Sequence, residues 1–470
     1  MGGSSQVARA HSAQEKLHMD EAGMCSLWRY AAFECLNEEC RRRYPLTEKL
    51  FVCPECGDLL HVVYEPADPA PDFIKARWRE RRLSEDPLDH SGVWRFRECL
   101  PPIAPGHIVT LREGNTPVYP ARFSAQYAGV RNLLFKHLGF NPTGSFKDYG
   151  MTVAVSQARA LGARILMCAS TGNTSASMAA YAARAGMRAI VLIPSENVAL
   201  GKIAQALEYG AVTLQVKGAS FDDVLHLVRE LSGRPDVYLL NSLNPFRIEG
   251  QKTIFIELLD QLGWNVPEHL VVPGGNLGNS VALFKAMEEL QRLGFISRFP
   301  KLTIVQAQGA SPLAEAVARG ARRITPVPHP RTQATAIRIG HPVNWRRALH
   351  ALEATGGFCL AVSEAEIAEA KAAIGRDGIG CEPASAATLA GIKRLREEGK
   401  LAPSETIVAL LTGHLLKDPE YTMRYHSHQL EDVLTGGHIL GRLANPPIPI
   451  EPRLDAIARY LYDFSLSDGR

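Results

Sequence analysis

The sequence predicts an α/β protein built on parallel sheets, with a small separate module near its N-terminus. From about residue 130 onward, apolar runs typical of strands alternate with alanine-rich segments typical of helices, and this rhythm favours a parallel sheet covered by helices. Four cysteines between residues 35 and 56 mark the separate module. With 470 residues, the chain is long enough for two or three domains.

The positions of the strands in the main body indicate where a ligand is expected to bind. They are predicted at Asn132–Lys136, Arg164–Ala169, Ala189–Pro194, Val212–Val216, Val237–Leu240, Leu270–Pro273, Leu302–Gln306 and Thr406–Leu411. In parallel sheets, ligands bind beyond the carboxyl ends of the strands, in the loops that lead into helices. The pattern Ser363-x-x-Glu366 adds a capping box that opens a helix to about Ile374, followed by Gly375.

The expected organisation has five segments. These are a flexible tail (1–24), a zinc-ribbon-like module (25–65), a linker and entry to the body (66–129), the main body (130–450) and a C-terminal segment (451–470). A smaller α/β subdomain, at about 150–245, is expected to be inserted in the larger one. This arrangement follows from the Pro/Asp-rich and Arg-rich stretch after the cysteines and from the strand and helix rhythm beyond it.

Composition excludes several classes of function. Lys plus Arg (52) nearly balance Asp plus Glu (49), and basic charge outside Arg41–Arg43 is not expected to be concentrated, so neither nucleic acid nor a membrane surface is an expected partner. No apolar run approaches the ~18 residues of a membrane span, and residues 1–24 lack a secretory core. A cytoplasmic location is expected, which suits the isolated thiols of Cys168, Cys359 and Cys381.

One lysine stands where carbonyl chemistry is favoured. Residues 141–150 read NPTGSFKDYG, a Pro/Gly turn that places Lys147 at the start of an alanine-rich helix. The positive end of a helix and partial desolvation both lower the pKa of a lysine and favour the neutral amine. A neutral amine is what a Schiff base with a carbonyl group requires.

Three further loops follow predicted strands, and two of them suit anions. Ser170, Thr171, Asn173 and Thr174 follow one strand and open a helix, where free amides and hydroxyls favour a carboxylate or phosphate. Residues 270–279, LVVPGGNLGN, resemble a phosphate nest and do not match the dinucleotide pattern G-x-G-x-x-G. The third loop ends a strand at Thr412, whose hydroxyl suits a heterocycle nitrogen without demanding that the nitrogen be charged.

In this order and content, the loops resemble fold-type II pyridoxal-phosphate enzymes, and among them the threonine synthase family. The resemblance covers roughly residues 25–450 and includes Glu113-Gly-Asn-Thr-Pro117, ATAIRIGHPVNW (334–345), CEPASAATLAG (381–391) and TGHLLKDP (412–419). It implies two parallel-sheet α/β domains, pyridoxal 5'-phosphate as cofactor, and a homodimer. The implied reaction converts O-phosphohomoserine and water to L-threonine and phosphate.

The resemblance also implies a role for each matching residue. Lys147 would hold the cofactor aldehyde, Asn173 its phenolic oxygen and Thr412 its pyridine nitrogen. The cofactor phosphate would be held by Gly274, Gly275, Asn276, Leu277, Gly278 and Asn279. The substrate phosphate would be held by Thr174, Asn241, Ser242 and Arg247, and the substrate α-carboxylate by Ser170 and Thr171. Arg247 suits phosphate physically because its planar guanidinium can donate two parallel hydrogen bonds.

Two positions depart from the family pattern. Tyr149 stands where the family usually has arginine, and Leu415 stands where it usually has a small residue. Neither replaces a residue expected to contact the cofactor. The two substitutions are expected to affect the detailed shape of the pocket and the range of substrates that it accepts.

The cysteine module has the spacing Cys35-x4-Cys40-x12-Cys53-x2-Cys56, with the look of a zinc knuckle at its second pair. Four thiolates suit a tetrahedral structural zinc site, and a module this small gains much of its stability from such a metal. The alternative is a degenerate ribbon, without metal, that rests against the body.

Other functions stay open at this point. An enzyme of the same fold that uses O-phosphoserine, of the cysteate synthase type, would need the same phosphate clamp. A serine/threonine dehydratase would not need it. A zinc-ribbon nucleic-acid binder would explain Cys35–Cys56 and Arg41–Arg43, but would leave about 400 residues without a role.

Overall fold

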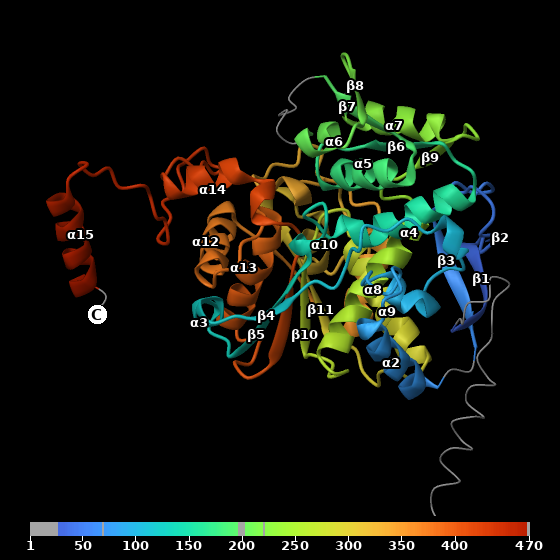
Figure 1. The fold of residues 1–470 in the computed structure, drawn as a ribbon, viewed down its shortest axis with the longest axis horizontal. Helices are drawn as coiled ribbons and strands as arrows, with labels where there is room; N and C mark the ends of the chain where they lie inside the picture. Colours follow the sequence, from blue (N-terminus) through green and yellow to red (C-terminus); the bar gives the residue numbers. More distant parts are fainter. Residues whose placement is uncertain (1–26, 68–69, 196–202, 220, 468–470) are drawn as a thin grey trace, which may run out of the picture.

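The computed structural model describes residues 27–67, 70–195, 203–219 and 221–467. The predicted tail (1–24) lies outside these residues. Within them the chain forms three sheets (Figure 1), two of them made wholly or mainly of parallel strands. The predicted α/β fold is therefore confirmed, together with a separate N-terminal sheet.

The elements follow one another in nearly regular alternation after residue 130. The strands are β1 Trp28–Cys35, β2 Arg43–Pro45, β3 Leu60–Pro66, β4 Val118–Pro120, β5 Asn132–His137, β6 Ile165–Ala169, β7 Arg188–Pro194, β8 Val212–Val216, β9 Val237–Leu239, β10 His269–Pro273, β11 Lys301–Ala307, β12 Phe358–Val362 and β13 Thr406–Leu411. The helices are α2 Pro71–Glu80, α3 Phe123–Ala128, α4 Lys147–Ala160, α5 Asn173–Ala185, α6 Ala204–Glu208, α7 Phe221–Leu231, α8 Pro245–Gln261, α9 Gly278–Arg292, α10 Pro312–Ala318, α11 Trp345–Thr355, α12 Glu364–Arg376, α13 Pro383–Glu397, α14 Pro419–His426 and α15 Leu454–Ser467.

The larger sheet has the strand order β12-β11-β10-β13-β5-β4, and only β4 runs antiparallel to its neighbour. Its central strand β10 is buried along its whole length, because helices cover both faces of the sheet. The carboxyl ends of β10 and β13 consequently meet at one edge. The predicted phosphate nest and Thr412 leave the sheet there.

The smaller sheet has the order β8-β7-β6-β9 and is parallel throughout. It forms the upper part of the molecule in Figure 1, with α5, α6 and α7 beside it. Its strands lie within the predicted subdomain at about 150–245, whose boundaries stay a prediction. The carboxyl end of β6 carries the loop from Ser170 to Thr174.

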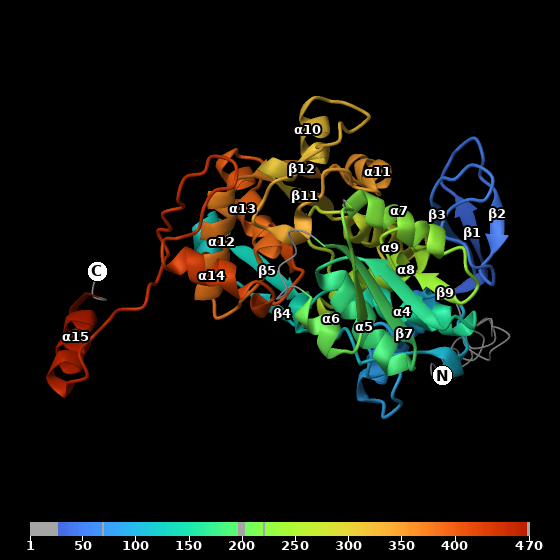
Figure 2. The ribbon, with the colours of Figure 1, turned by 90° about the horizontal axis from the view of Figure 1, so that it is seen from above.

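The N-terminal sheet, β2-β1-β3, is antiparallel and packs at the side of the larger domain (Figures 1 and 2). It is joined to α8 and α9 by buried charges. Tyr64 donates a hydrogen bond to Glu249 at 2.5 Å, and Lys285 bonds both Glu249 and the Val62 carbonyl. Because these groups are buried and mutually satisfied, the module is held in one position against the body.

All eight predicted strands are present, within about one residue at each end. The capping box of α12 is also confirmed, since Ser363 accepts from the Glu366 amide and Glu366 from the Ser363 amide. The predicted end of that helix was wrong: α12 continues through Gly375 to Arg376, and the left-handed glycine lies later, at Gly378 with φ of 75°.

At the other end of the chain, α15 lies apart from the body after an extended segment, and both views agree on this (Figures 1 and 2). None of the helices in the described part of the chain is both long and apolar enough to cross a bilayer.

Candidate active site

One cavity of about 3390 Å³ lies between the two parallel sheets, and the predicted site residues converge on it. It is lined by all of the residues predicted to bind cofactor or substrate except Gly274. Gly274 lies behind the loop, where its amide donates to the Val305 carbonyl at 2.7 Å. A Cβ on Gly274 would lie 2.7 Å from Ile304, so this glycine lets the loop pack on β11.

Lys147 opens α4 at the end of a tightly fixed turn. The buried carboxylate of Asp148 accepts hydrogen bonds from the Thr143 amide at 2.8 Å, the Thr143 hydroxyl at 2.6 Å and the Ser177 hydroxyl at 2.5 Å. The Phe146 amide donates to the Thr412 carbonyl at 2.9 Å. These bonds place Lys147 beside the end of β13, although 265 positions separate it from Thr412 in the sequence.

The Lys147 amine is poised to be neutral. Part of its surface is open to the cavity, yet protein surrounds it closely, and its Nζ lies 4.1 Å from the centre of the Phe146 ring. Desolvation, with repulsion from Arg247, lowers the pKa of Lys147 to about 7, against the attraction of Glu382. Near neutral pH a large fraction of this lysine is therefore an uncharged nucleophile.

The loop after β10 has the geometry of an anion nest. Leu277 adopts a left-handed backbone conformation, with φ of 62°, immediately before α9 begins at Gly278. That conformation turns successive backbone amides toward one point, at the positive end of the helix. Both side-chain atoms of Asn279, Oδ1 and Nδ2, are buried and have no hydrogen-bond partner among the described residues. The loop therefore fits a phosphate group.

A second anion-binding region lies at the start of α8. Arg247 is 4% exposed and donates one hydrogen bond, to the Leu240 carbonyl at 3.2 Å, while its Nε has no partner within the described part of the chain. Burial lowers the pKa of Arg247 to about 10, still well above neutrality. Arg247 is thus a buried cation with unused donors that faces the cavity.

Asn241 and Ser242 line the same cavity as Arg247. The Asn241 amide exchanges two hydrogen bonds with the backbone of Ala169, each of 3.0 Å, so one Nδ2 hydrogen is left for a ligand. On the neighbouring strand β6, the loop that contains Ser170, Thr171 and Thr174 leads into α5, which starts at Asn173.

Three cavity residues were missed by the sequence reasoning. Glu382 accepts hydrogen bonds from Asn173 at 2.9 Å and from Thr412 at 3.1 Å, and Lys417 bonds the side chain of Gln205. The motifs around 382 and 417 were noticed only as part of the resemblance. Glu382 is the residue directly before α13, and Lys417 lies in the loop after β13, so neither position by itself indicates a contact with the other loops of the cavity.

The two departures from the family pattern lie outside the cavity wall. Tyr149 is fully buried, and its hydroxyl contacts Thr116 at 3.0 Å and Glu257 at 3.1 Å. Leu415 packs against Gly380. Neither side chain lines the cavity, so any effect on substrate range has to pass through its neighbours.

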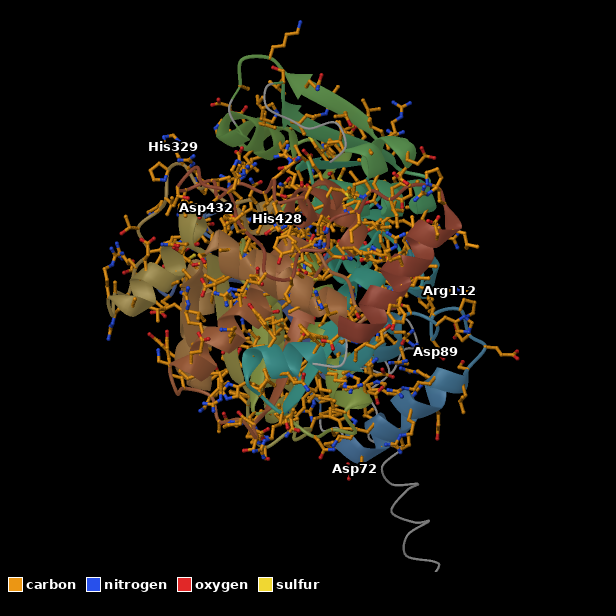
Figure 3. The ribbon with its side chains drawn as sticks, turned by 90° about the vertical axis from the view of Figure 1, so that its left-hand side faces the viewer. Asp72, Asp89, Arg112, His329, His428 and Asp432 are labelled. Atoms are coloured by element: carbon orange, nitrogen blue, oxygen red, sulfur yellow. The ribbon has the colours of Figure 1, made fainter. Side chains whose placement is uncertain are left out.

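One expectation about charge was wrong. Between Glu315 and Glu353 the chain has seven arginines and three histidines and no acidic residue, so basic charge is concentrated there. Much of this segment lines the outer part of the cavity, including Arg322, Arg338 and Arg347. His329 of the same segment lies exposed at the molecular surface (Figure 3). A cavity mouth of this charge favours anionic ligands.

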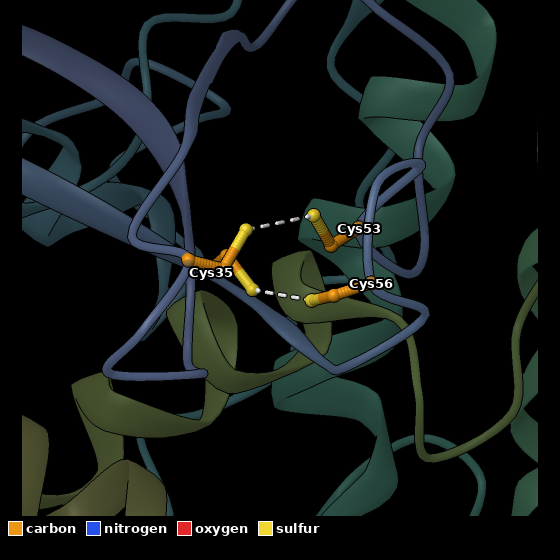
Figure 4. A group of neighbouring side chains, drawn as sticks. Cys35, Cys53 and Cys56 are labelled. Atoms are coloured by element: carbon orange, nitrogen blue, oxygen red, sulfur yellow. Dashed lines mark hydrogen bonds between the residues drawn. The ribbon is translucent and has the colours of Figure 1, made fainter.

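The four cysteines of the N-terminal module converge, as the spacing predicted. Their sulfur atoms all lie within 4.8 Å of one another, with Cys35 to Cys56 at 3.4 Å and Cys40 to Cys53 at 3.8 Å (Figure 4). A tetrahedral zinc ion with roughly 2.3 Å bonds separates its sulfur ligands by about 3.8 Å. The cluster therefore fits a metal ion, and its distances exceed the roughly 2.05 Å of a disulfide.

Comparison with known proteins agrees with this geometry. Residues 109–413 match the model of the family described as pyridoxal-phosphate dependent enzyme. The chain is 48% identical to the threonine synthase of Methanocaldococcus jannaschii over 82% of this chain and 93% of that protein. It is 46% identical to the threonine synthase of Methanosarcina acetivorans over 81% and 91%, respectively.

Solved structures share the fold. A threonine deaminase from T.th. is 27% identical, with a TM-score of 0.53 over 64% of this chain and 92% of that one. The processed threonine deaminase isoform 2 of Solanum lycopersicum is 20% identical, with a TM-score of 0.56 over 78% and 92%, and supports the fold alone.

Proposed function

The chain belongs to the threonine synthase family of pyridoxal-phosphate-dependent lyases, and we propose that it converts O-phosphohomoserine and water to L-threonine and phosphate. The observation that best supports this substrate is the position of Arg247, a buried cation with an unused hydrogen-bond donor in the same cavity as Lys147. Identity of 45–48% to several threonine synthases supports the reaction.

The residues present fit the cofactor. The nest from Gly275 to Asn279 would hold its phosphate, with the orphaned Asn279 amide as an added partner. Asn173 would hold its phenolic oxygen, Thr412 its pyridine nitrogen and Lys147 its aldehyde. When bound, the cofactor supplies a conjugated ring that stores the negative charge formed on substrate carbon.

The remaining chemistry falls to side chains of this chain. With a pKa near 7, the Lys147 amine can take protons from the substrate α and β carbons and return protons to the γ and α carbons, while water adds at the β carbon after phosphate has left. Arg247, Asn241, Ser242 and Thr174 would hold the substrate phosphate until it leaves the γ carbon. Ser170 and Thr171, at the N-terminus of α5, would hold the α-carboxylate. Lys147 thus transfers protons, and the other residues hold the substrate in position.

For the cysteine cluster we propose a structural zinc ion bound by Cys35, Cys40, Cys53 and Cys56. The spacing of the four sulfur atoms supports it, and the degenerate ribbon without metal is the alternative. A cytoplasmic location is likewise proposed, in line with the free thiols of the described cysteines. The homodimer stays a prediction.

A panel of three substrates tests the reaction. We expect purified enzyme to release threonine and phosphate in equal amounts from O-phosphohomoserine, and to act poorly on O-phosphoserine and on free threonine. The two phosphate esters differ by one methylene, which changes the reach from the ring to Arg247. Efficient turnover of O-phosphoserine would favour the cysteate synthase type, and rapid deamination of threonine would favour a dehydratase.

A further inference from the structure

The N-terminal module contacts both of the parallel-sheet domains. On one side, buried charges tie it to α8 and α9 of the larger domain. On the other side, the Lys49 amine donates hydrogen bonds to the carbonyls of Ser232 at 2.9 Å and Val237 at 3.2 Å, and it also donates to the Arg234 carbonyl between them. Ser232 follows the end of α7 and Val237 begins β9, so these carbonyls belong to the smaller domain. The module and β9 lie next to each other in both views (Figures 1 and 2).

Two aromatic rings of the module pack on the link segment, residues 238–247, which leads from β9 into α8. The Phe51 ring meets the Tyr238 ring of β9 edge to face, with the ring centres 5.0 Å apart. The Phe33 ring meets the Phe246 ring in the first turn of α8 in the same way, at 5.6 Å. All four rings are buried. Because buried rings in a close-packed interior have few other positions, each pair restricts the movement of the link segment.

The residues assigned to the substrate phosphate lie on the link segment, between or beside these two contacts. Asn241 and Ser242 follow β9, and Arg247 lies in the first turn of α8. Two hydrogen bonds join Asn241 to the Ala169 backbone of β6, whereas Arg247 donates to Leu240 of the link segment itself. The smaller sheet therefore fixes the β9 end of the segment, and the module packs on both ends. None of the four rings lines the cavity, so these contacts support the segment without touching a ligand.

We propose that the N-terminal module is a positioning element for the substrate phosphate, and that Phe33, Lys49 and Phe51 hold the link segment at the correct distance from Lys147. This inference deepens the proposed function and rests on its assignment of the substrate phosphate to the link segment. A displacement of about 1 Å in a group that binds substrate can cost about 100-fold in rate, so a support outside the cavity is able to control turnover.

The alternative is a module that only adds stability to the fold. A contact of that kind would change the unfolding temperature, but it would not change the reaction of a phosphate ester more than the reaction of an amino acid without phosphate. The two roles are therefore distinguished by comparing these two reactions in the same variant.

Two variants test the proposal in the full-length holoenzyme. Lys49→Met removes the hydrogen bonds to the three carbonyls and keeps an unbranched apolar side chain. Phe51→Leu removes the ring pair with Tyr238 and keeps an apolar side chain. The matched controls are Lys75→Met, which changes a half-buried lysine of α2, and Phe295→Leu, which changes a buried ring of the larger domain. Neither control residue lines the cavity.

The first measurement is amide hydrogen exchange of the link segment, followed by mass spectrometry with no substrate present. We expect exchange about tenfold faster in Lys49→Met and Phe51→Leu, because local opening of the segment becomes easier. Both controls should exchange at the rate of the unmodified enzyme in this segment. The unfolding temperature of each variant is measured beside it.

The second measurement compares two reactions. In both test variants, kcat/KM for O-phosphohomoserine should fall by about tenfold or more, because the phosphate clamp is no longer held in place. The exchange of the α proton of alanine with solvent deuterium should stay nearly unchanged, because alanine has no phosphate. Both controls should leave the two reactions nearly unchanged.

Unchanged hydrogen exchange in the test variants would overturn the proposal, as would faster exchange with an unchanged kcat/KM. An equal loss of both reactions would also overturn it, because the module would then support the whole fold. If Phe51→Leu does not fold, Lys49→Met decides alone, since Lys49 is only half-buried. If the unmodified enzyme does not act on O-phosphohomoserine, the proposed function fails by itself, and hydrogen exchange still decides whether the module holds the link segment.

Discussion

Replacing Arg247 with alanine should reduce kcat/KM for O-phosphohomoserine by about 100-fold or more. Arg247 lies at the start of α8 with its Nε unpartnered among the described residues and one bond to Leu240. A hydrogen bond to a charged group contributes about 1.5–3 kcal/mol, and a bidentate phosphate contact includes two. Even a total of about 3 kcal/mol corresponds to more than 100-fold, since each 1.4 kcal/mol is about tenfold.

The assay follows phosphate and threonine release from O-phosphohomoserine at several substrate concentrations. The matched control is Arg229→Ala, which removes an exposed arginine of α7 that lines the same cavity. It should change kcat/KM by less than tenfold, because an exposed charge is screened by solvent. A thermal unfolding curve for each variant separates a lost contact from a lost fold.

A substrate without phosphate provides the second comparison. Exchange of the α proton of a simple amino acid with solvent deuterium does not need a phosphate clamp, so Arg247→Ala should leave that rate nearly unchanged. If the variant loses both activities equally, Arg247 supports the fold rather than the phosphate. If it loses neither, the phosphate-ester assignment is wrong even though the cofactor assignment stands.

Three further predictions follow from the site and the module. Lys147→Ala should abolish turnover and leave the unfolding temperature nearly unchanged. In the unmodified apoprotein, the rate of cofactor uptake should rise with pH and level off above about 7, because the depressed pKa of Lys147 leaves its amine neutral there. An uptake rate that keeps rising to pH 10 would indicate a lysine with an ordinary pKa. Thr412→Asp should impair catalysis more than cofactor affinity. The substitution places a second buried carboxylate beside Glu382, whereas the phosphate nest that holds the cofactor is left intact. Unchanged turnover together with an unchanged cofactor spectrum would show that Thr412 does not face the ring. Cys53→Ser combined with Cys56→Ser should release about one zinc ion per chain and loosen the module, with little direct effect on the catalysed reaction. Metal analysis would measure the zinc, and limited proteolysis would measure the loosening. Unmodified protein without zinc would favour the degenerate ribbon.

Much of the fold could be predicted from the sequence because the buried parallel strands carry strong local signals. Strand β13 is a run of apolar residues with its last five fully buried, and its predicted bounds are those observed. Strand β12 was missed, because four of its five residues are only half-buried and no clear alternation marks it. The short β4 was missed too, since its three residues contain a proline and pair only along the sheet edge.

The candidate site was predictable where one loop carries its own chemistry, as at Lys147 and in the nest after β10. Glu382 could not be predicted in this way. Its partners Thr412 and Asn173 lie 30 and 209 positions away, and only the packing of α13 against the ends of β13 and α5 brings them together. The charge of the cavity mouth can be read from the sequence after Glu315, but the nearly balanced total charge of the chain conceals it.

The most direct test of the account is to identify the lysine that carries the cofactor. Reduction of the holoenzyme with borohydride fixes the cofactor to the amine that binds it, and peptide mass spectrometry then locates the added mass. We predict a single modified peptide that contains Lys147, and no modification in Lys147→Ala. An adduct on another lysine, such as Lys417 in the same cavity, would contradict the central assignment.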